Sequence, residues 1–235
     1  MSTFVLVHGA WHGAWCWYKV IPRLEARGHT VFAPDSQSHG LERTPPQETT
    51  LAGIVSGIRR VVEAASEPVI LVGHSFGGMV ITQVAEECPT NVKALVYVAA
   101  FLPQNGQSVL DLNQDDPESL MEFEFLDEGR LARAKPEKVR EVFYGQCPDE
   151  DVALARLMLV SDGVQPYATP VSTTSANWGR IPRTYIECVR DRAIGISRQR
   201  RMQAAQPCRR VLTLDTDHSP FFSAPDALVA CLTEG

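Results

Sequence analysis

The stretch Gly73-His74-Ser75-Phe76-Gly77-Gly78 decides the fold. It follows an apolar run at residues 68–72 and precedes a segment with helical spacing. A turn this sharp from strand to helix strains the backbone and needs small residues on both sides of its centre, a need that Gly73 and Gly77 meet. The turn lifts the Ser75 hydroxyl above the sheet at a helix N-terminus, where backbone N–H groups favour a developing anion. A glycine-rich structural turn with an incidental serine is the alternative.

Short apolar runs alternate with helical patterns along most of the chain. Besides residues 68–72, we expect strands at residues 4–7, 30–33, 94–98, 184–188 and 210–214. Continuously apolar strands are typical of a parallel sheet covered on both faces, and the alternation with helices favours right-handed crossovers. The sequence therefore predicts a single α/β domain, residues 1–235, with a mostly parallel, doubly wound sheet of about six strands and helices on both faces.

Residues 51–65 have the spacing of one such helix, with Thr49 or Thr50 as its N-cap. From about residue 103 to residue 180 the alternation of strands and helices stops, and no buried strand is evident. Charged helical patterns lie there at about 131–142 and 149–159. The segment is too long for a plain connection, so we predict a helical cap inserted over the ligand-binding side of the sheet. An ordinary surface subdomain is the alternative.

Composition excludes several classes of function. A net charge of -6 gives no electrostatic support for nucleic-acid binding. No apolar run approaches the roughly 20 residues of a membrane-spanning helix, and Met1-Ser2-Thr3 leads directly into a strand-like run without a signal-peptide pattern. We therefore expect a cytoplasmic protein that binds neither nucleic acid nor membrane. A homodimer through the cap or an edge helix is compatible with the sequence.

The sequence also points to chemistry without a cofactor. The six cysteines are scattered without a CxxC pair, which favours reduced core residues over disulfides or metal ligands. No cluster of histidine, cysteine or aspartate has ligand spacing, and no glycine-rich phosphate loop occurs. We expect no metal and no organic cofactor.

A serine hydroxyl needs a base to act as a nucleophile at neutral pH. Of six histidines, His218 follows the last predicted strand and therefore lies at the carboxyl end of the sheet. Asp191 follows the fifth strand at the same edge, and the order nucleophile, acid, histidine is the one that this fold uses. A solvated loop histidine is the alternative for His218.

For Asp191 the alternative is a surface ion pair with Arg190 or Arg192. Other carboxylates compete for the role of orienting the histidine. They are Glu187, inside the strand, and Asp215 and Asp217, next to the histidine in sequence.

An acyl-transfer intermediate carries an oxyanion, which backbone N–H groups should stabilise. We expect these donors at Phe76, directly after the serine, and at Ala10, after the first strand. Gly9, Trp11 and His74 border these positions and are the candidate substrate-binding residues. Trp11 belongs to an aromatic group with Trp15, Trp17 and Tyr18, which lines an apolar pocket or packs in the core, with core packing favoured for Trp15 and Trp17.

The chain resembles a known family at these residues. Residues 4–15, FVLVHGAWHGAW, are similar to the opening of the plant methylesterase and hydroxynitrile lyase branch of the α/β hydrolases, as are residues 73–78 and 143–155. Residues 191–194 resemble the family's acid motif, and the ending at residues 217–220 resembles bacterial salicylate-type esterases. The resemblance implies an α/β-hydrolase fold.

It also implies a triad of Ser75, Asp191 and His218 with Ala10 and Phe76 as oxyanion donors. The family's lyases carry threonine at the position of Gly9 and a lysine directly after the histidine, where this chain has Ser219. Cyanide release without that cation loses its charge stabilisation.

We therefore expect an esterase acting on a small, largely apolar ester, methyl or aryl, through an acyl-enzyme. Two alternatives remain. One is a cofactor-free lyase, carbon–carbon hydrolase or cyclase on the same triad, and the other is a binding protein that keeps the fold.

Overall fold

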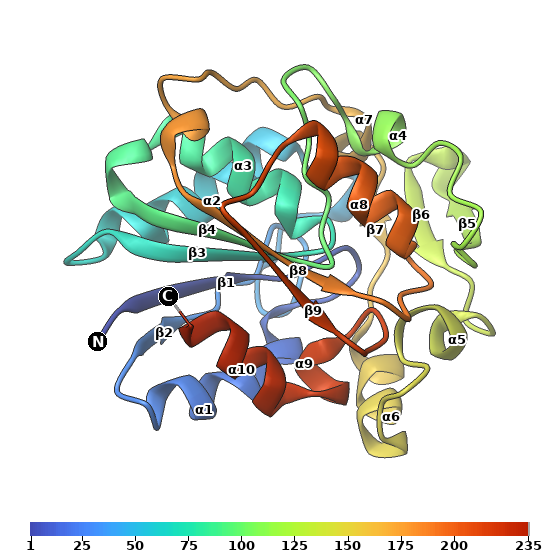
Figure 1. Ribbon diagram of the computed structural model, residues 1–235. Coiled ribbons are helices and arrows are strands. Elements are labelled where there is room, and N and C mark those ends of the chain that lie inside the picture. Colours follow the sequence, from blue (N-terminus) through green and yellow to red (C-terminus); the bar gives the residue numbers. More distant parts are fainter. Residues whose placement is uncertain (235) are drawn as a thin grey trace.

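The computed structural model describes residues 1–234, and its centre is a six-stranded parallel sheet (Figure 1). The strand order is β2-β1-β3-β4-β8-β9, so the chain starts one strand in from an edge, adds β2 at that edge and then crosses the sheet to β9. All six predicted strands are confirmed, with small differences at their ends. The strands are β1 (Thr3–Val7), β2 (Thr30–Phe32), β3 (Val69–His74), β4 (Val92–Val98), β8 (Arg183–Cys188) and β9 (Arg210–Leu214).

Helices cover both faces of this sheet, as predicted (Figure 1). On one face lie α2 (Leu51–Ala64), α3 (Gly77–Glu87) and α8 (Ile196–Ala205). On the other lie α1 (Val20–Glu25), α9 (Pro220–Ser223) and α10 (Pro225–Thr233). Helix α2 begins after Thr50, whose hydroxyl accepts a hydrogen bond from the Gly53 amide at 3.0 Å. Thr50 is therefore the N-cap, the second of the two threonines that the sequence offered.

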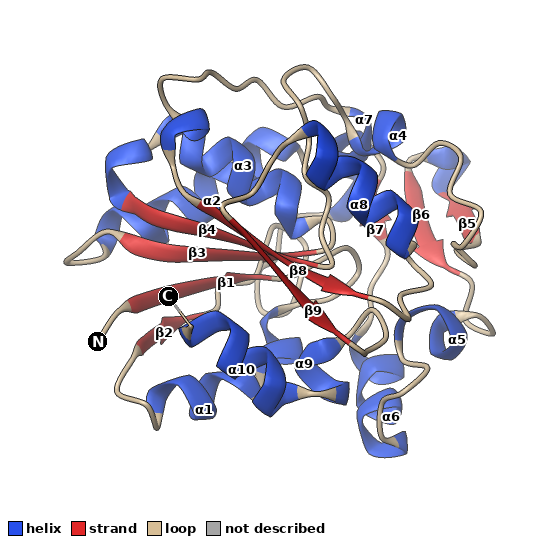
Figure 2. Ribbon diagram, viewed as in Figure 1, coloured by secondary structure: helices blue, strands red, loops and turns tan. Residues whose placement is uncertain are grey.

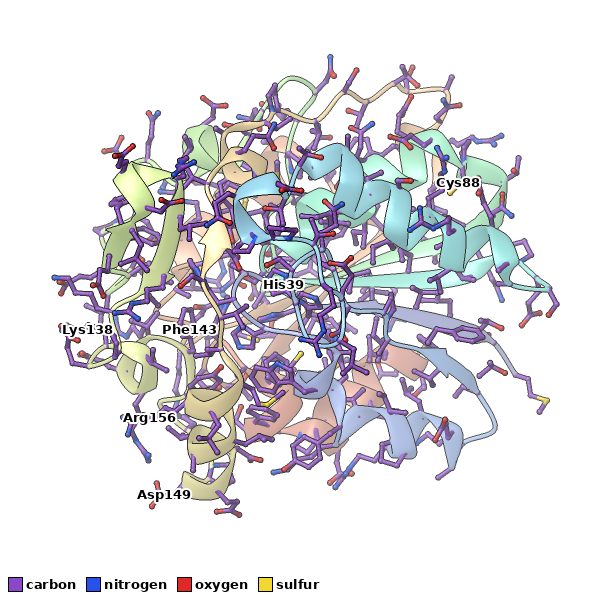
Figure 3. All side chains as sticks on the ribbon, turned by 180° about the vertical axis from the view of Figure 1, so that it is seen from behind. His39, Cys88, Lys138, Phe143, Asp149 and Arg156 are labelled. Atoms are coloured by element: carbon purple, nitrogen blue, oxygen red, sulfur yellow. The ribbon has the colours of Figure 1, made fainter. Side chains whose placement is uncertain are left out.

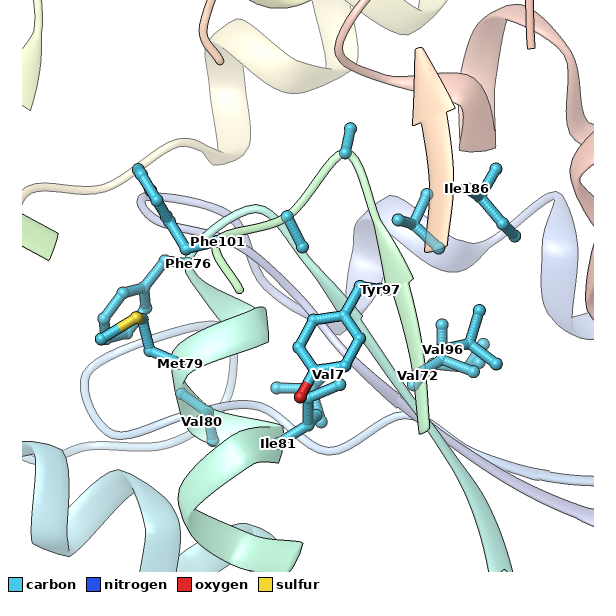
Figure 4. Close-up of a cluster of buried hydrophobic side chains, with 14 of the residues drawn as sticks. Val7, Val72, Phe76, Met79, Val80, Ile81, Val96, Tyr97, Phe101 and Ile186 are labelled. Atoms are coloured by element: carbon cyan, nitrogen blue, oxygen red, sulfur yellow. The ribbon is translucent and has the colours of Figure 1, made fainter. Parts of the chain in front are cut away.

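The core beneath α3 fixes the place where the sheet meets the site (Figure 4). Tyr97 of β4 is fully buried and faces this helix (Figure 4), since its hydroxyl lies 2.7 Å from that of Thr82 of α3. Val80 and Ile81 of α3 are also fully buried. Each such side chain contributes about 1.5–3 kcal/mol when it leaves water. The junction of β3 and α3 therefore rests on rigid packing.

The segment over the carboxyl ends of the strands differs from the helical cap that we expected. It contains an antiparallel sheet of β5 (Phe123–Leu126), β6 (Leu131–Ala134) and β7 (Asp162–Gly163), in addition to helices (Figure 2). The helices are α4 (Val109–Leu112), α5 (Val139–Phe143), α6 (Asp149–Met158) and α7 (Gln165–Ala168). The prediction of one helix at residues 131–142 is wrong, because β6 occupies its first part. We call residues 103–180 the cap.

The cap buries some of its apolar side chains and leaves others, such as Phe125 and Leu157, exposed. In Figure 3, Lys138, Asp149 and Arg156 lie toward the outside of the cap, whereas Phe143 of α5 is only 1% exposed. The inner face is therefore apolar where it covers the sheet. Within residues 1–234, the helices are all too short or too polar to cross a membrane.

Candidate active site

Ser75 stands at the strained turn between β3 and α3. Its φ angle is +54°, a left-handed conformation that costs an L-residue roughly 1–2 kcal/mol. Three backbone hydrogen bonds hold it there. Its N–H donates to Val98 at 3.3 Å, and its C=O accepts from Gly78 at 3.0 Å and from Phe101 at 3.1 Å. The surrounding structure thus fixes a conformation that a free chain would avoid.

The glycines beside Ser75 are required by close backbone approach. A Cβ on Gly73 would lie 2.6 Å from the Gly77 carbonyl oxygen, and a Cβ on Gly77 would lie 2.7 Å from the Val7 carbonyl oxygen. The Val7 oxygen cannot move without disturbing β1, and the Gly77 oxygen cannot move without disturbing the first turn of α3. These close contacts explain why both positions need a residue without a Cβ, as the sequence predicted.

His218 and Asp191 meet at the edge of the sheet. His218 Nδ1 lies 2.7 Å from Asp191 Oδ2, and both side chains are at most 1% exposed. The other carboxylate oxygen, Oδ1, accepts from the amides of Ala193 at 2.7 Å and Ile194 at 2.9 Å. Burial raises the pKa of Asp191, and its pairing with His218 together with the two amide hydrogen bonds opposes that rise. The carboxylate is held in one orientation toward the imidazole.

The competing carboxylates face other partners. Glu187 pairs with Arg200 at 2.9 Å. Asp215 forms an exposed pair with Arg190 at 2.6 Å. Asp217 accepts hydrogen bonds from Gln146, Cys147, Ser219 and Ser223. The surface ion pair that was the alternative for Asp191 involves Asp215 instead.

His74 links the loop of His218 to the turn. Its Nε2 lies 2.8 Å from the His218 carbonyl oxygen, and the centroids of the two rings are 4.6 Å apart. Its side chain is completely buried, and burial holds the pKa of His74 well below its usual value. His74 was expected to contact substrate, but it lies under the site and supports it. Among residues 1–234, no hydrogen bond joins the Ser75 hydroxyl to His218, a link that often tightens only when substrate binds.

The Gly9–Ala10 peptide, which carries the Ala10 N–H, is held by His8. The Gly9 carbonyl oxygen lies 2.8 Å from His8 Nδ1, and His8 Nε2 accepts from the Ser36 amide at 3.0 Å. The proton of His8 is therefore on Nδ1, and burial keeps the pKa of this histidine well below its usual value. Because a trans peptide is planar, the Ala10 N–H points away from His8.

A cavity of about 110 Å³ lies over Ser75. The core contributes Ala10, Trp11, Phe76 and Phe101, and the cap contributes Leu110, Met121, Phe123, Phe125, Phe143 and Tyr167. Within the described chain, the amides of Ala10 and Phe76 donate no hydrogen bond to a protein acceptor. The cavity thus joins one hydroxyl, two free N–H groups and an apolar wall.

Of the other sequence candidates, Trp11 lines the cavity and Trp17 is buried in the core. Gly9 does not line it, but a Cβ there would lie 2.7 Å from the Ser75 Cβ. Gly9 therefore makes room for the serine.

Most of the cap side chains that form the apolar wall of this cavity were not predicted from the sequence. The alternation Phe123-Glu124-Phe125 has the period of a strand, and that signal was available. The roles of His8, His12 and His39 had no such signal, because each depends on a partner distant in sequence or on the shape of a loop.

Comparison with known proteins agrees with this geometry. A family model described as "Alpha/beta hydrolase family" matches residues 4–231. Putative methylesterase 11, chloroplastic, of Arabidopsis thaliana is 35% identical over 99% of this chain and 63% of its own length, so the chain spans less than two thirds of that relative. Methylesterase 7 of the same plant is 34% identical, covering 99% of this chain and 95% of its own.

Among solved structures, a pyrethroid hydrolase from Sphingobium faniae JZ-2 superposes with a TM-score of 0.90 at 30% identity, covering 98% of this chain and 95% of that one. Fold, site geometry and full-length similarity agree, and this chain belongs to the alpha/beta hydrolase family.

Proposed function

We propose that this chain is a carboxylic-ester hydrolase that works through Ser75, His218, Asp191 and an acyl-enzyme. The observation that carries the proposal is the position of Ser75. It is held in a left-handed conformation at an apolar cavity whose wall includes two amides without a protein partner. That combination suits a nucleophile whose product state carries a negative charge.

The base in this mechanism is His218. Its Nδ1–H donates to Asp191, which leaves Nε2 with a lone pair to take the proton from the Ser75 hydroxyl. The oxygen then attacks the ester carbonyl carbon. The carboxylate of Asp191 stabilises the imidazolium that forms and keeps its tautomer fixed.

The oxyanion of the tetrahedral intermediate accepts hydrogen bonds from the amides of Ala10 and Phe76. The N-terminus of α3, which begins at Gly77, adds a favourable dipole. The imidazolium of His218 returns its proton to the leaving alcohol, and the acyl group stays on Ser75. Water, deprotonated by the same imidazole, then releases the carboxylic acid.

The wall of the cavity favours a small, neutral, largely apolar ester. Aromatic and aliphatic side chains dominate it, and no lysine or arginine of the described chain lines it. A charged group would lose its hydration there without gaining a partner. The names of the relatives, methylesterases and a pyrethroid hydrolase, support a methyl or aryl ester.

The same absence of a cation disfavours cyanohydrin cleavage as the second candidate. Ser219 follows His218, and its buried hydroxyl cannot replace the charge of an ammonium group beside departing cyanide. Mandelonitrile assayed beside a panel of methyl and aryl esters separates the two reactions. Cyanide release without ester turnover would reverse the ranking.

Replacing Ser75 with alanine tests the proposal directly. Turnover of p-nitrophenyl acetate should fall on the order of 10⁴–10⁶-fold, as for removal of a triad nucleophile. Ser56→Ala, on the solvent side of α2, is the matched control and should keep the wild-type rate. Near-full activity in Ser75→Ala would end the proposal.

A further inference from the structure

A buried carboxylate of the cap lies against the loop that carries Ala10. Asp162 of β7 is 5% exposed and does not line the cavity over Ser75. Its Oδ2 accepts from the Trp11 amide at 2.9 Å and from the Tyr167 hydroxyl, and its Oδ1 lies 2.7 Å from His39 Nε2. Three groups from three segments thus converge on one side chain.

His39 supplies the charge that a buried carboxylate needs. Its other nitrogen, Nδ1, lies 2.7 Å from the Gln37 carbonyl oxygen, so both ring nitrogens face acceptors and both carry protons. Burial lowers the pKa of His39, but the charge and hydrogen bond of Asp162 outweigh it and the pKa is raised. Figure 3 places His39 near the middle of the molecule. The result is a buried ion pair outside the triad.

This pair holds the peptide that follows Ala10. Trp11 has a φ of +61°, which an L-residue adopts only when its surroundings impose it. The Ala10–Trp11 peptide is held at both ends, because its N–H donates to Asp162 and its C=O lies 2.7 Å from His12 Nδ1. The peptide before it, Gly9–Ala10, carries the Ala10 N–H and is held at its C=O by His8. Ala10 therefore joins two fixed peptides, and the cap fixes the second of them.

We propose that Asp162, charge-balanced by His39, is a positioning residue that acts through the Ala10–Trp11 peptide and, together with His8, keeps the Ala10 N–H directed at the oxyanion. The inference rests on the proposed ester hydrolysis. A structural tether between cap and core is the competing explanation. The two explanations predict different kinetic effects. An oxyanion donor that points in the wrong direction lowers kcat and leaves ground-state binding of the substrate unchanged.

The test compares Asp162→Ala with Asp162→Asn on p-nitrophenyl acetate. In Asp162→Ala, kcat should fall about 10–100-fold, below the 10²–10³-fold cost of losing a donor outright, while KM changes less than about threefold. The amide oxygen in Asp162→Asn still accepts from Trp11, so this variant should recover most of the lost rate. It also guards against a fold failure in the alanine variant.

A second readout isolates the oxyanion. A trifluoromethyl ketone binds as a hemiketal anion on the serine, so its affinity should fall in Asp162→Ala by the same factor as kcat/KM. The affinity of an unreactive alcohol product should stay within about twofold.

Asp151→Asn is the matched control. Asp151 of α6 is 1% exposed and also ties the cap to the core, through Tyr18 and Lys19. This variant should lose a similar amount of thermal stability and keep kcat within about twofold.

Three results would overturn the inference. They are an unchanged kcat in Asp162→Ala, a kcat loss that Asp151→Asn shares in proportion to its lower Tm, or a kcat loss without weaker binding of the trifluoromethyl ketone. Absence of ester turnover in the wild-type protein would instead refute the proposed function, and this inference with it.

Discussion

Replacing Asp191 with asparagine should disable the proposed base while leaving the fold in place. In the native site Oδ1 accepts from two backbone amides, Ala193 and Ile194, and Oδ2 faces His218 Nδ1 at 2.7 Å. The asparagine oxygen can satisfy the two amides only if its NH₂ group turns toward His218. The imidazole must then accept at Nδ1 and carry its proton on Nε2, where it cannot take the proton of Ser75. The opposite amide orientation sets NH₂ against two N–H donors, which costs about 1–3 kcal/mol per unmade hydrogen bond.

The wrong tautomer should lower kcat about 10⁴-fold, the size of effect known for this substitution in a serine protease triad. The assay is p-nitrophenyl acetate turnover together with the rate of labelling by a fluorophosphonate. Asp215→Asn is the control, because Asp215 pairs with Arg190 at the surface and should be dispensable. A kcat for Asp191→Asn within tenfold of wild type would refute the reasoning.

Other predictions concern stability. Gly78→Ala should fail to fold or lose several kcal/mol of unfolding free energy, because its Cβ would lie 2.1 Å from the Phe101 carbonyl oxygen. Gly57→Ala, whose Cβ would have its nearest atom at 4.0 Å, should gain about 0.5–1 kcal/mol of unfolding free energy in urea. If both variants unfold alike, close packing is not what requires the glycine at 78. The pKa of His12 is lowered from 6.5 to about 4, so the unfolded state binds more protons between these values and stability should rise with pH across that window, by up to about 3 kcal/mol from this residue. Urea titrations at pH 4.5 and 7 should show that dependence reduced in His12→Asn, and an equal dependence in both proteins would contradict it. The raised pKa of His39 gives stability that is complete below the unfolded value of about 6.5 and lost as pH rises through the folded value, so the Tm difference between wild type and His39→Gln should be larger at pH 6 than at pH 9. A difference that grows with pH would show that the imidazolium is not the stabilising form.

The central sheet could be predicted because its strands are short, apolar runs that end in recognisable turns. The turn at Gly73 to Gly78 could also be predicted, because a sharp strand-to-helix turn requires small residues beside its centre. His218 and Asp191 followed from their places after the last strands, since parallel strands bring their carboxyl ends to one edge. Their contact at 2.7 Å is what that reasoning required, and the catalytic roles remain predictions.

The cap could not be derived in the same way. Its strands are only two to four residues long, and β6 carries Arg133 between two buried alanines, so it is not a continuous apolar run. The pairing of Asp162 with the Trp11 amide joins residues 151 positions apart, which no local pattern predicts. The expected cytoplasmic location and homodimer also stay predictions, because the structure of a single chain tests neither a compartment nor a partner.

Mapping a fluorophosphonate adduct by mass spectrometry tests the central claim most directly. The folded wild-type protein should carry one adduct, on the peptide that contains Ser75, and labelling should be absent in Ser75→Ala and much slower in His218→Ala. A folded protein that hydrolyses esters with no adduct, or with its adduct on another residue, would contradict the account.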